Sequence, residues 1–399
     1  MKMGQIKLCH IQVLPLLSGV QRVMLEIIRL LDRERYEVTV ICKDEGALTE
    51  ILWQQGVKVM TLSCLDRNIN PIMDLKTFGE FVKIFRKEKF HIVHTHSTKP
   101  GFLGRVAAKL CNIPVIIHHV HGFGFHEFSS SIWTSLLLLL EKIAGRGSDR
   151  VIFVNDEERE LAVRKGIVPP EKAITIYNGV NLKTFNPSKK NAGKFIREEL
   201  GIPSNHYVIG FVGRFWEQKD PGSFVEIVKI LIQEYKVENV SFLMIGDGHL
   251  KKTIEKKILE YGLGGKLHIL GWRNDNENIY PALDLFVLPS LWEGMPLTII
   301  EAMASGIPVL ASDIKGNREV IIEGETGFLL PAKRPDAFAN IINYRLFRNE
   351  NLMHYMGEHG RKRAEKLFDG EANMMKIIEI YRSCLQEKGI LPELNGVSI

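Results

Sequence analysis

The chain has 399 residues, which is more than one ordinary hydrophobic core supports, and this length predicts two domains. Its 45% hydrophobic and 25% charged residues are typical of a soluble globular protein and exclude a low-complexity chain. The net charge of +5 is uneven, because residues 1–185 hold 25 Lys and Arg against 19 Asp and Glu, while the remainder holds 27 against 28. Ordinary solvated surface explains the basic first half best, and contact with an anionic membrane or substrate is the alternative. We expect no nucleic-acid partner.

Five scattered cysteines, with no CxxC pair, indicate a reducing compartment and argue against a disulfide framework or a zinc ribbon. The apolar segment 8–17 is interrupted by polar residues and favours a first strand over a signal peptide. The longest apolar run, 132–140, is far shorter than the roughly 20 residues that span a bilayer. We therefore expect a cytoplasmic protein that lies at most peripherally on the inner face of the cell membrane.

In the first half, strand-like and helix-like segments alternate along the chain. Strands are predicted at 7–13, 37–41, 57–62, 91–94, 114–119, 150–154 and 173–177, and helices at 20–31, 47–55, 74–89, 101–110, 131–144 and 156–165. Such alternation is typical of parallel strands joined by crossover helices.

The alternation breaks near the middle of the chain and then resumes. Residues 183–205 are polar and contain Pro187, Gly193 and Pro203, which predicts a linker. A second α/β series follows, with strands at 207–212, 240–245, 266–269, 285–288, 309–311 and 327–330 and a helical tail over 336–385. The predicted fold class is α/β, with Rossmann-like domains at 1–182 and 206–370 and a C-terminal helix, 371–399, packing back toward the first domain. Two such domains usually face a shared cleft, the default ligand site.

The most informative segment is 289–310. It predicts a helix that opens at Pro296 and ends before Gly306, with Glu293 just ahead of it and Glu301 about five residues inside. Glu301 then lies roughly 7 Å deeper than the free N–H groups at the helix start. A helix N-terminus attracts phosphate, and a carboxylate accepts hydrogen bonds from two vicinal hydroxyls. The pattern therefore suits a sugar nucleotide.

A second motif, Gly213 to Lys219, directly follows the predicted strand 207–212. The carboxyl ends of parallel strands are where such domains bind ligands. Arg214 offers a fork of donors to phosphate oxygens, and Lys219 precedes a helix start from which it reaches the same anion. Two cations suit a diphosphate leaving group. In isolation the motif fits two surface cations better, and the combination with segment 289–310 reverses that preference.

Together, Gly213-Arg214-x4-Lys219 and Glu293-Gly-Met-Pro-Leu-x3-Glu301 closely resemble the retaining glycosyltransferases of family 4, the group 1 transferases with the two-Rossmann-domain GT-B fold. The resemblance implies that Arg214 and Lys219 bind the donor diphosphate and that Glu301 holds the ribose. The donor-binding residues that it implies are Gly19, Arg214, Lys219, Gly246, Trp272, Arg273, Glu293, Gly294, Met295, Pro296, Leu297 and Glu301. The catalytic set that it implies is His121, Arg214, Lys219 and Glu293.

The resemblance is looser in the first half. The Gly-Gly loop that the family usually carries after the first strand is Ser18-Gly19 here, and Gln21 stands where an acidic residue is usual. Seven of the 13 histidines lie between positions 91 and 126. A metal site among them is conceivable, but no carboxylate or cysteine completes a ligand set nearby, so we expect none. Resemblance instead places His121 beside the donor sugar.

By the same resemblance, His96, Phe123 and His126 lie on the acceptor side. The apolar residues from Phe123 to Leu140 form either a core helix, which is the simpler interpretation, or an interfacial patch that meets a lipid-linked acceptor.

The predicted function is retaining transfer of a sugar from a nucleotide-diphosphate donor, most often a UDP-sugar in this family, to a hydroxyl of a glycan or polyprenyl-diphosphate-linked acceptor. The chain has no Asp-x-Asp, so no cofactor or metal is expected for the transfer. A GT-B epimerase or phosphorylase and a non-catalytic sugar-nucleotide sensor are the alternatives. A dinucleotide oxidoreductase is disfavoured because no GxGxxG occurs.

Overall fold

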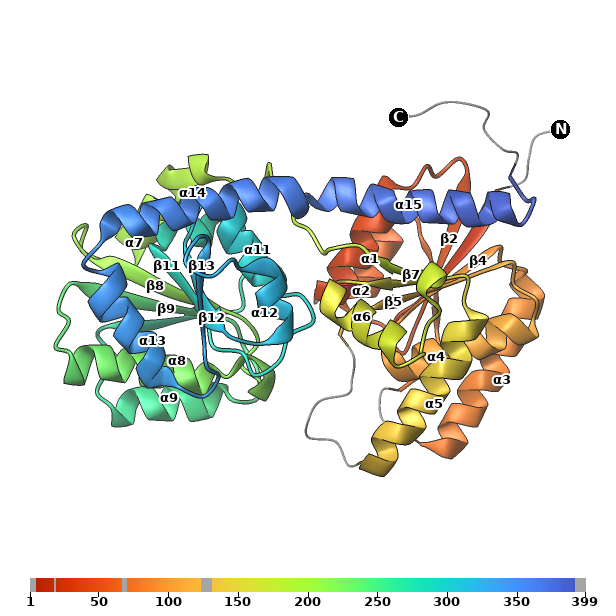
Figure 1. Cartoon of the computed structure of the whole chain (residues 1–399), viewed down its shortest axis with the longest axis horizontal. Helices are drawn as coiled ribbons and strands as arrows, with labels where there is room; N and C mark the ends of the chain where they lie inside the picture. Colours follow the sequence, from red (N-terminus) through yellow and green to blue (C-terminus); the bar gives the residue numbers. More distant parts are fainter. Residues whose placement is uncertain (1–4, 18, 67–69, 123–130, 392–399) are drawn as a thin grey trace. The chain divides into compact units, whose positions relative to one another are not determined.

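A computed structural model describes residues 5–17, 19–66, 70–122 and 131–391, with the backbone alone at 131–137. The chain divides into two compact units (Figure 1). The first unit comprises Met1–Asn178 together with Glu371–Ile399, and the second comprises Gly179–Gly370.

Within the described residues, the first unit contains a parallel sheet of seven strands in the order β3-β2-β1-β4-β5-β6-β7. The strands are β1 Ile6–Ile11, β2 Tyr36–Cys42, β3 Lys58–Thr61, β4 Ile92–His96, β5 Val115–Val120, β6 Arg150–Phe153 and β7 Ala173–Thr175. The helices are α1 Gly19–Leu30, α2 Ala47–Gln54, α3 Pro71–Glu88, α4 Thr98–Leu110, α5 Ser131–Gly147, α6 Asp156–Arg164 and α15 Gly370–Glu387.

Helices cover both faces of this sheet because successive side chains of each strand point to opposite faces. Leu8 of β1 packs in a core with α1, α2 and α15, whereas its neighbour Cys9 packs in a separate core with α3 and α4. The C-terminal helix α15 buries Ile377 and Tyr381 in the first of these cores. The segment that follows Gly370 thus belongs structurally to the first unit.

A buried ion pair joins α4 to α5. Arg105 Nη2 donates to both carboxylate oxygens of Glu141, at 3.0 and 2.8 Å, and the two side chains are only 1% and 5% exposed. Arg105 Nε also donates to the carbonyl of Gly101 at 2.9 Å. The guanidinium is therefore well supplied with acceptors, as a charge removed from water must be.

The second unit contains, among its described residues, a parallel sheet of six strands in the order β10-β9-β8-β11-β12-β13. The strands are β8 Tyr207–Val212, β9 Val240–Ile245, β10 Leu267–Gly271, β11 Leu285–Leu288, β12 Val309–Ser312 and β13 Gly327–Leu330. The helices are α7 Lys190–Glu199, α8 Pro221–Lys229, α9 Lys251–Glu260, α10 Asn276–Ile279, α11 Leu297–Ala304, α12 Lys315–Val320, α13 Pro335–Ile341 and α14 Glu350–Leu367. Two Rossmann-like parallel-sheet units confirm the predicted α/β fold class.

The segment 183–205, predicted to be a linker, is instead part of the second unit and contains α7. Helix α7 buries Ile196, and Arg197 donates to the carbonyl of Ala282 and to the Asp284 carboxylate, both at 2.8 Å. These contacts tie a locally polar segment to residues about 85 positions away. The first unit also ends at Asn178 rather than at residue 182.

All five cysteines are free thiols, as their spacing predicts. Along the part of the chain that the structure describes, no helix combines the length and the apolar character needed to cross a membrane.

Candidate functional site

The site residues predicted in the second half gather at one edge of the second sheet. Gly213 follows β8, Gly246 follows β9, Trp272 follows β10, and Glu293 lies in the loop after β11. These four strands are parallel and adjacent, so their carboxyl ends share an edge. This edge is where open α/β sheets bind their ligands.

Lys219 and Glu293 form an ion pair at this edge. Lys219 Nζ lies 2.5 Å from Glu293 Oε1, and the two side chains are 12% and 5% exposed. Ser290 Oγ donates to the same carboxylate oxygen at 2.7 Å, and Gln218 Nε2 donates to the other at 3.3 Å. Three donors from two loops thus hold the buried carboxylate charge, as burial of a charge requires.

Gln218 links this ion pair to Arg214. Its side-chain oxygen accepts a hydrogen bond from Arg214 Nη2 at 3.1 Å, and its backbone carbonyl accepts one from Leu291 N at 2.8 Å. The Arg214 guanidinium also lies over the Trp216 ring, 4.7 Å from the ring centre. The loop after β8 and the loop after β11 therefore form one polar unit with two cations, Arg214 and Lys219.

Gly246 is required by the close approach of the loop after β9 to the loop after β8. Its φ is +145°, and a Cβ on this residue would lie 1.9 Å from the carbonyl oxygen of Gly213. Only glycine accommodates both constraints. The backbone thus holds the start of the Arg214 loop in place.

Helix α11 carries the second anion-binding feature. Pro296 precedes the helix in an extended conformation, one residue outside the predicted start, and Gly306, with φ +76°, follows its end as predicted. The first N–H groups of a helix, here those of Leu297 and Thr298, lack an acceptor within it. Gly294 and Met295 form the loop between Glu293 and this helix start.

Glu301 is 4% exposed inside α11 and accepts a hydrogen bond from the Tyr280 hydroxyl at 2.8 Å. Tyr280, itself fully buried, holds this carboxylate in one orientation. A carboxylate at such a position is a group of the kind that accepts hydrogen bonds from hydroxyls.

Trp272 and Arg273 both follow β10, and they differ in the exposure and the pairing of their side chains. Trp272 is half exposed, and its Nε1 donates to Asn274 Oδ1 at 3.1 Å. Arg273 forms a two-pronged pair with Asp275, at 2.8 Å for each contact. These hydrogen bonds raise the pKa of Arg273 and lower the pKa of Asp275. Because its side chain is half exposed, Trp272 offers an aromatic face at the sheet edge.

The site residues predicted in the first half lie in the other unit. Gly19 is the first residue of α1 and is exposed. His96 ends β4, and His121 follows β5, with 3.1 Å between His96 Nδ1 and His121 Nε2. Burial lowers the pKa of His121 to about 3, so its imidazole is neutral at physiological pH. Phe123 and His126 fall outside the described residues.

Comparisons with known proteins agree with these features. The family model "Glycosyl transferases group 1" matches residues 193–363, and "Glycosyltransferase Family 4" matches residues 17–184. An Escherichia coli protein, UDP-Gal:alpha-D-GlcNAc-diphosphoundecaprenol alpha-1,3-galactosyltransferase, is 38% identical over 379 residues, covering 95% of this chain and 97% of that protein. This chain belongs to the family 4, group 1 glycosyltransferases.

One further relative and one solved structure are also similar to this chain. The Staphylococcus aureus capsular polysaccharide biosynthesis glycosyltransferase CapM is 26% identical over 372 residues, covering 90% of this chain and 93% of that one. The crystal structure of Anabaena HepE in complex with UDP and glucose matches with a TM-score of 0.80 at 21% identity, covering 95% of this chain and 100% of that one. At that identity the match supports the GT-B fold alone.

Sequence patterns missed three side chains that contact the predicted site residues in the structure: Gln218, Ser290 and Tyr280. Gln218 and Ser290 lie just beyond the ends of β8 and β11, and this placement was the available signal. Tyr280 had no such signal, because it reaches Glu301 from 21 positions away.

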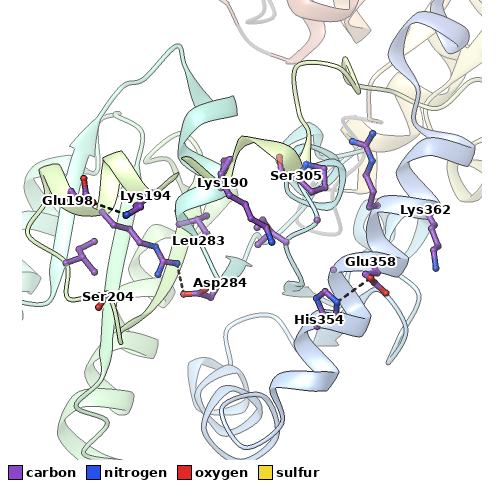
Figure 2. Close-up of a pocket in the computed structure, with 18 of the residues that line it drawn as sticks. Lys190, Lys194, Glu198, Ser204, Leu283, Asp284, Ser305, His354, Glu358 and Lys362 are labelled. Carbon is purple, nitrogen blue, oxygen red and sulfur yellow. Dashed lines mark hydrogen bonds and ion pairs between the residues drawn. The ribbon is translucent and has the colours of Figure 1, made fainter. Parts of the chain in front are cut away.

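The second unit also contains a cavity of about 810 Å³ (Figure 2). It is lined by Asp284, just before β11, and by Ile307, just before β12, so it opens at the amino ends of the strands. Some of its polar side chains pair with one another, as between Arg197 and Asp284 at 2.8 Å and between His354 and Glu358 at 3.3 Å. None of the predicted donor-binding residues lines it.

Proposed function

We propose that this glycosyltransferase moves a sugar from a UDP-sugar, with retention at the anomeric carbon, to a hydroxyl of a polyprenyl-diphosphate-linked glycan. The observation that carries the proposal is the polar unit of Arg214, Gln218, Lys219 and Glu293 at the carboxyl edge of the second sheet. The name of the Escherichia coli relative supports the substrates, since it contains UDP-Gal and a diphosphoundecaprenol acceptor.

In this proposal the donor diphosphate lies between the two cations and the start of α11. Arg214 and Lys219 neutralise the charge that the diphosphate gains as the sugar departs, and the N–H groups of Leu297 and Thr298 bind phosphate oxygens. Glu301 accepts hydrogen bonds from the ribose hydroxyls, and Trp272 flanks the base. No metal or other cofactor is assigned to the transfer.

The proposed chemistry has one bond breaking and one bond forming on the same face of the sugar. The bond from the anomeric carbon to the diphosphate oxygen breaks, and its electron pair stays on the diphosphate. The acceptor oxygen bonds to the same carbon, and its proton passes to the departing phosphate oxygen. Glu293, His121 and Gly19 are assigned to the donor sugar and phosphates, and His96, Phe123 and His126 to the acceptor side.

The donor assignment is tested by melting temperature. A ligand that binds only the folded state raises it by mass action. We expect UDP and UDP-sugars to stabilise the protein, and GDP-sugars and ADP-sugars to have no effect. Stabilisation by a GDP-sugar or an ADP-sugar alone would overturn the assignment of the base.

The transfer is tested with UDP-hexoses and UDP-N-acetylhexosamines and a synthetic lipid diphosphate that carries one N-acetylglucosamine. Retention predicts an α-linked product from an α-linked donor, read from its anomeric proton coupling. An inverted product would refute the stereochemistry. A UDP-sugar isomer formed without acceptor would indicate an epimerase, and binding without hydrolysis or transfer would indicate a sensor.

We also propose peripheral contact with an anionic membrane, supported by the basic first half and the lipid-linked acceptor of the Escherichia coli relative. Leu139 and Ile143 of α5 are each 55% exposed and provide apolar surface for such contact. Flotation with anionic liposomes at low salt is the test, and absence of co-flotation would remove the proposal.

A further inference from the structure

Five histidines share one face of the first sheet. The parallel register pairs His10 of β1 with His94 of β4, and His96 of β4 with His119 of β5. Because alternate residues of a strand point to the same face, His121 joins the other four. This face is the one that α1, α2 and α15 cover.

Three of these side chains, His10, His94 and His96, are completely buried and lie close together. The ring centroids are 5.0 Å apart for His10 and His94, 5.4 Å for His10 and His96, and 4.4 Å for His94 and His96. Among the described residues, no partner reaches Nε2 of His10 or Nε2 of His94. Buried polar atoms without a partner are costly and rare, and an ion held by these rings would give His94 Nε2 a partner.

We propose that His10, His94 and His96 bind one divalent transition-metal ion of the Zn²⁺ class. Each offers one ring nitrogen, and the three ligand atoms lie within 4.8 Å of one another. His10 Nδ1 and His96 Nε2 are 3.1 Å apart and share a hydrogen bond, which the ion would replace. Nitrogen ligands about 2.0–2.1 Å from a tetrahedral zinc ion are separated by roughly 3.3 Å, so small side-chain shifts complete the site.

In two of the three histidines, the ring nitrogen that would not bind the ion contacts another side chain. Metal-binding imidazoles generally have such a contact. His94 Nδ1 lies 2.5 Å from the Tyr381 hydroxyl of α15, which directs His94 Nε2 away from that helix. His96 Nδ1 lies 3.1 Å from His121 Nε2, which directs His96 Nε2 toward His10. These contacts fix which nitrogen of each ring is available to an ion.

The ligand chemistry selects the class of ion. Imidazole suits zinc, copper and nickel, whereas calcium and magnesium require oxygen ligands. A second set, His96, His119 and His121, shares His96 and so competes for the same ion. We assign the ion to the first set because its three side chains are all fully buried, whereas His121 is partly exposed. The site includes His96, which the proposed transfer assigns to the acceptor side, but zinc binding is measured without donor or acceptor, so its test does not depend on the transfer.

The test uses the full chain, free of any affinity tag and stripped with a chelator. Equilibrium dialysis against ZnCl₂ followed by elemental analysis should give one Zn²⁺ per chain, and Co²⁺ should show a visible absorption spectrum that differs from that of the aqueous ion. Zn²⁺ should also raise the melting temperature. No bound zinc at micromolar concentration, or a cobalt spectrum equal to that of buffer, would overturn the proposal.

Substitutions of single side chains test which residues bind the ion. His94→Gln and His10→Gln should lose at least tenfold in zinc affinity. Tyr381→Phe, which keeps the ring, should lose about 10–100-fold through the support of His94. The matched control is His118→Gln, because His118 is equally buried but lies on the opposite face and bonds to Thr95 Oγ1 at 2.8 Å.

Circular dichroism verifies that each variant is folded, and Tyr381→Phe keeps the proposal testable if a buried His→Gln variant fails to fold. The control should bind zinc like the wild type. Loss of binding in His119→Gln together with full binding in His94→Gln would show that the assigned ligands are wrong. Unchanged zinc affinity in both Tyr381→Phe and His94→Gln would refute the site.

Discussion

Replacing Lys219 with alanine tests the central electrostatic claim of the proposed transfer. The change removes one of the two cations assigned to the diphosphate and the partner of Glu293, whose carboxylate is 2.5 Å from Lys219 Nζ. By analogy with losing an oxyanion donor, we expect a loss of about 2–4 kcal/mol in transition-state stabilisation. That corresponds to a decrease of roughly 30- to 900-fold in kcat/KM.

The same change should lower the free energy of unfolding by less than the loss of a fully buried ion pair does. Breaking a fully buried ion pair costs about 3–5 kcal/mol. Glu293 keeps two donors, Ser290 Oγ at 2.7 Å and Gln218 Nε2 at 3.3 Å, so its charge is not left unpartnered. We expect a decrease of about 1–3 kcal/mol in the free energy of unfolding, the cost of a hydrogen bond to a charged group. Urea denaturation measures it, and the variant should remain folded.

The assay is initial-rate transfer with varied UDP-sugar at saturating acceptor, with Lys229→Ala as the matched control. Lys229 is a cation of the same unit that lies over the Tyr261 ring, 4.7 Å from its centre, and it has no assigned role. The control should keep kcat/KM within about twofold, since surface changes away from a site have small effects. In Lys219→Ala/Glu293→Gln the two losses should not add, because the residues are in contact. Wild-type kcat/KM in Lys219→Ala would refute the reasoning.

Three further predictions concern other parts of the molecule. Tyr280→Phe removes the hydrogen bond that orients Glu301, so KM for the donor should rise about 5- to 30-fold with little change in kcat; an unchanged KM would contradict the ribose assignment. Gly246→Ala should lower the melting temperature and the activity together, because its φ of +145° and the 1.9 Å approach leave no room for a Cβ; wild-type thermal stability would contradict this. Glu141→Gln should cost about 3–5 kcal/mol in urea denaturation, because it leaves the Arg105 guanidinium buried without its counter-charge; a loss below 1 kcal/mol would contradict the buried pair.

The sequence predicted most of the fold because the signal for each element is local. Alternating apolar strands and amphipathic helices imply parallel sheets wherever they occur, and both sheets are parallel as expected. The segment 183–205 was wrongly predicted to be a linker because its composition is mostly polar. Its helix α7 is held by Ile196, which is buried, and by Arg197, whose partners lie in the segment before β11. Composition within a window contains no information about such distant partners.

Some residues of the candidate site could likewise be predicted from local sequence, and others could not. Arg214, Lys219, Glu293 and Glu301 were predictable because each belongs to a short motif with a recognisable position next to a strand end or helix start. Gln218 was not singled out, although it lies inside a motif, because its role depends on Glu293, 75 positions later. That pairing exists only because β8 and β11 are neighbours in the sheet.

The histidine cluster separates the contributions of sequence and tertiary structure most clearly. The spacing His94-Thr95-His96 by itself determines that two imidazoles share a face, because strand side chains alternate. Only the strand order β1-β4-β5 brings His10 and His119 beside them, and only the return of α15 to the first sheet places Tyr381 on His94, across 287 positions of sequence. Alternation is a property of each strand's own backbone, whereas strand order and helix docking minimise exposed apolar surface over the whole unit and have no local signature.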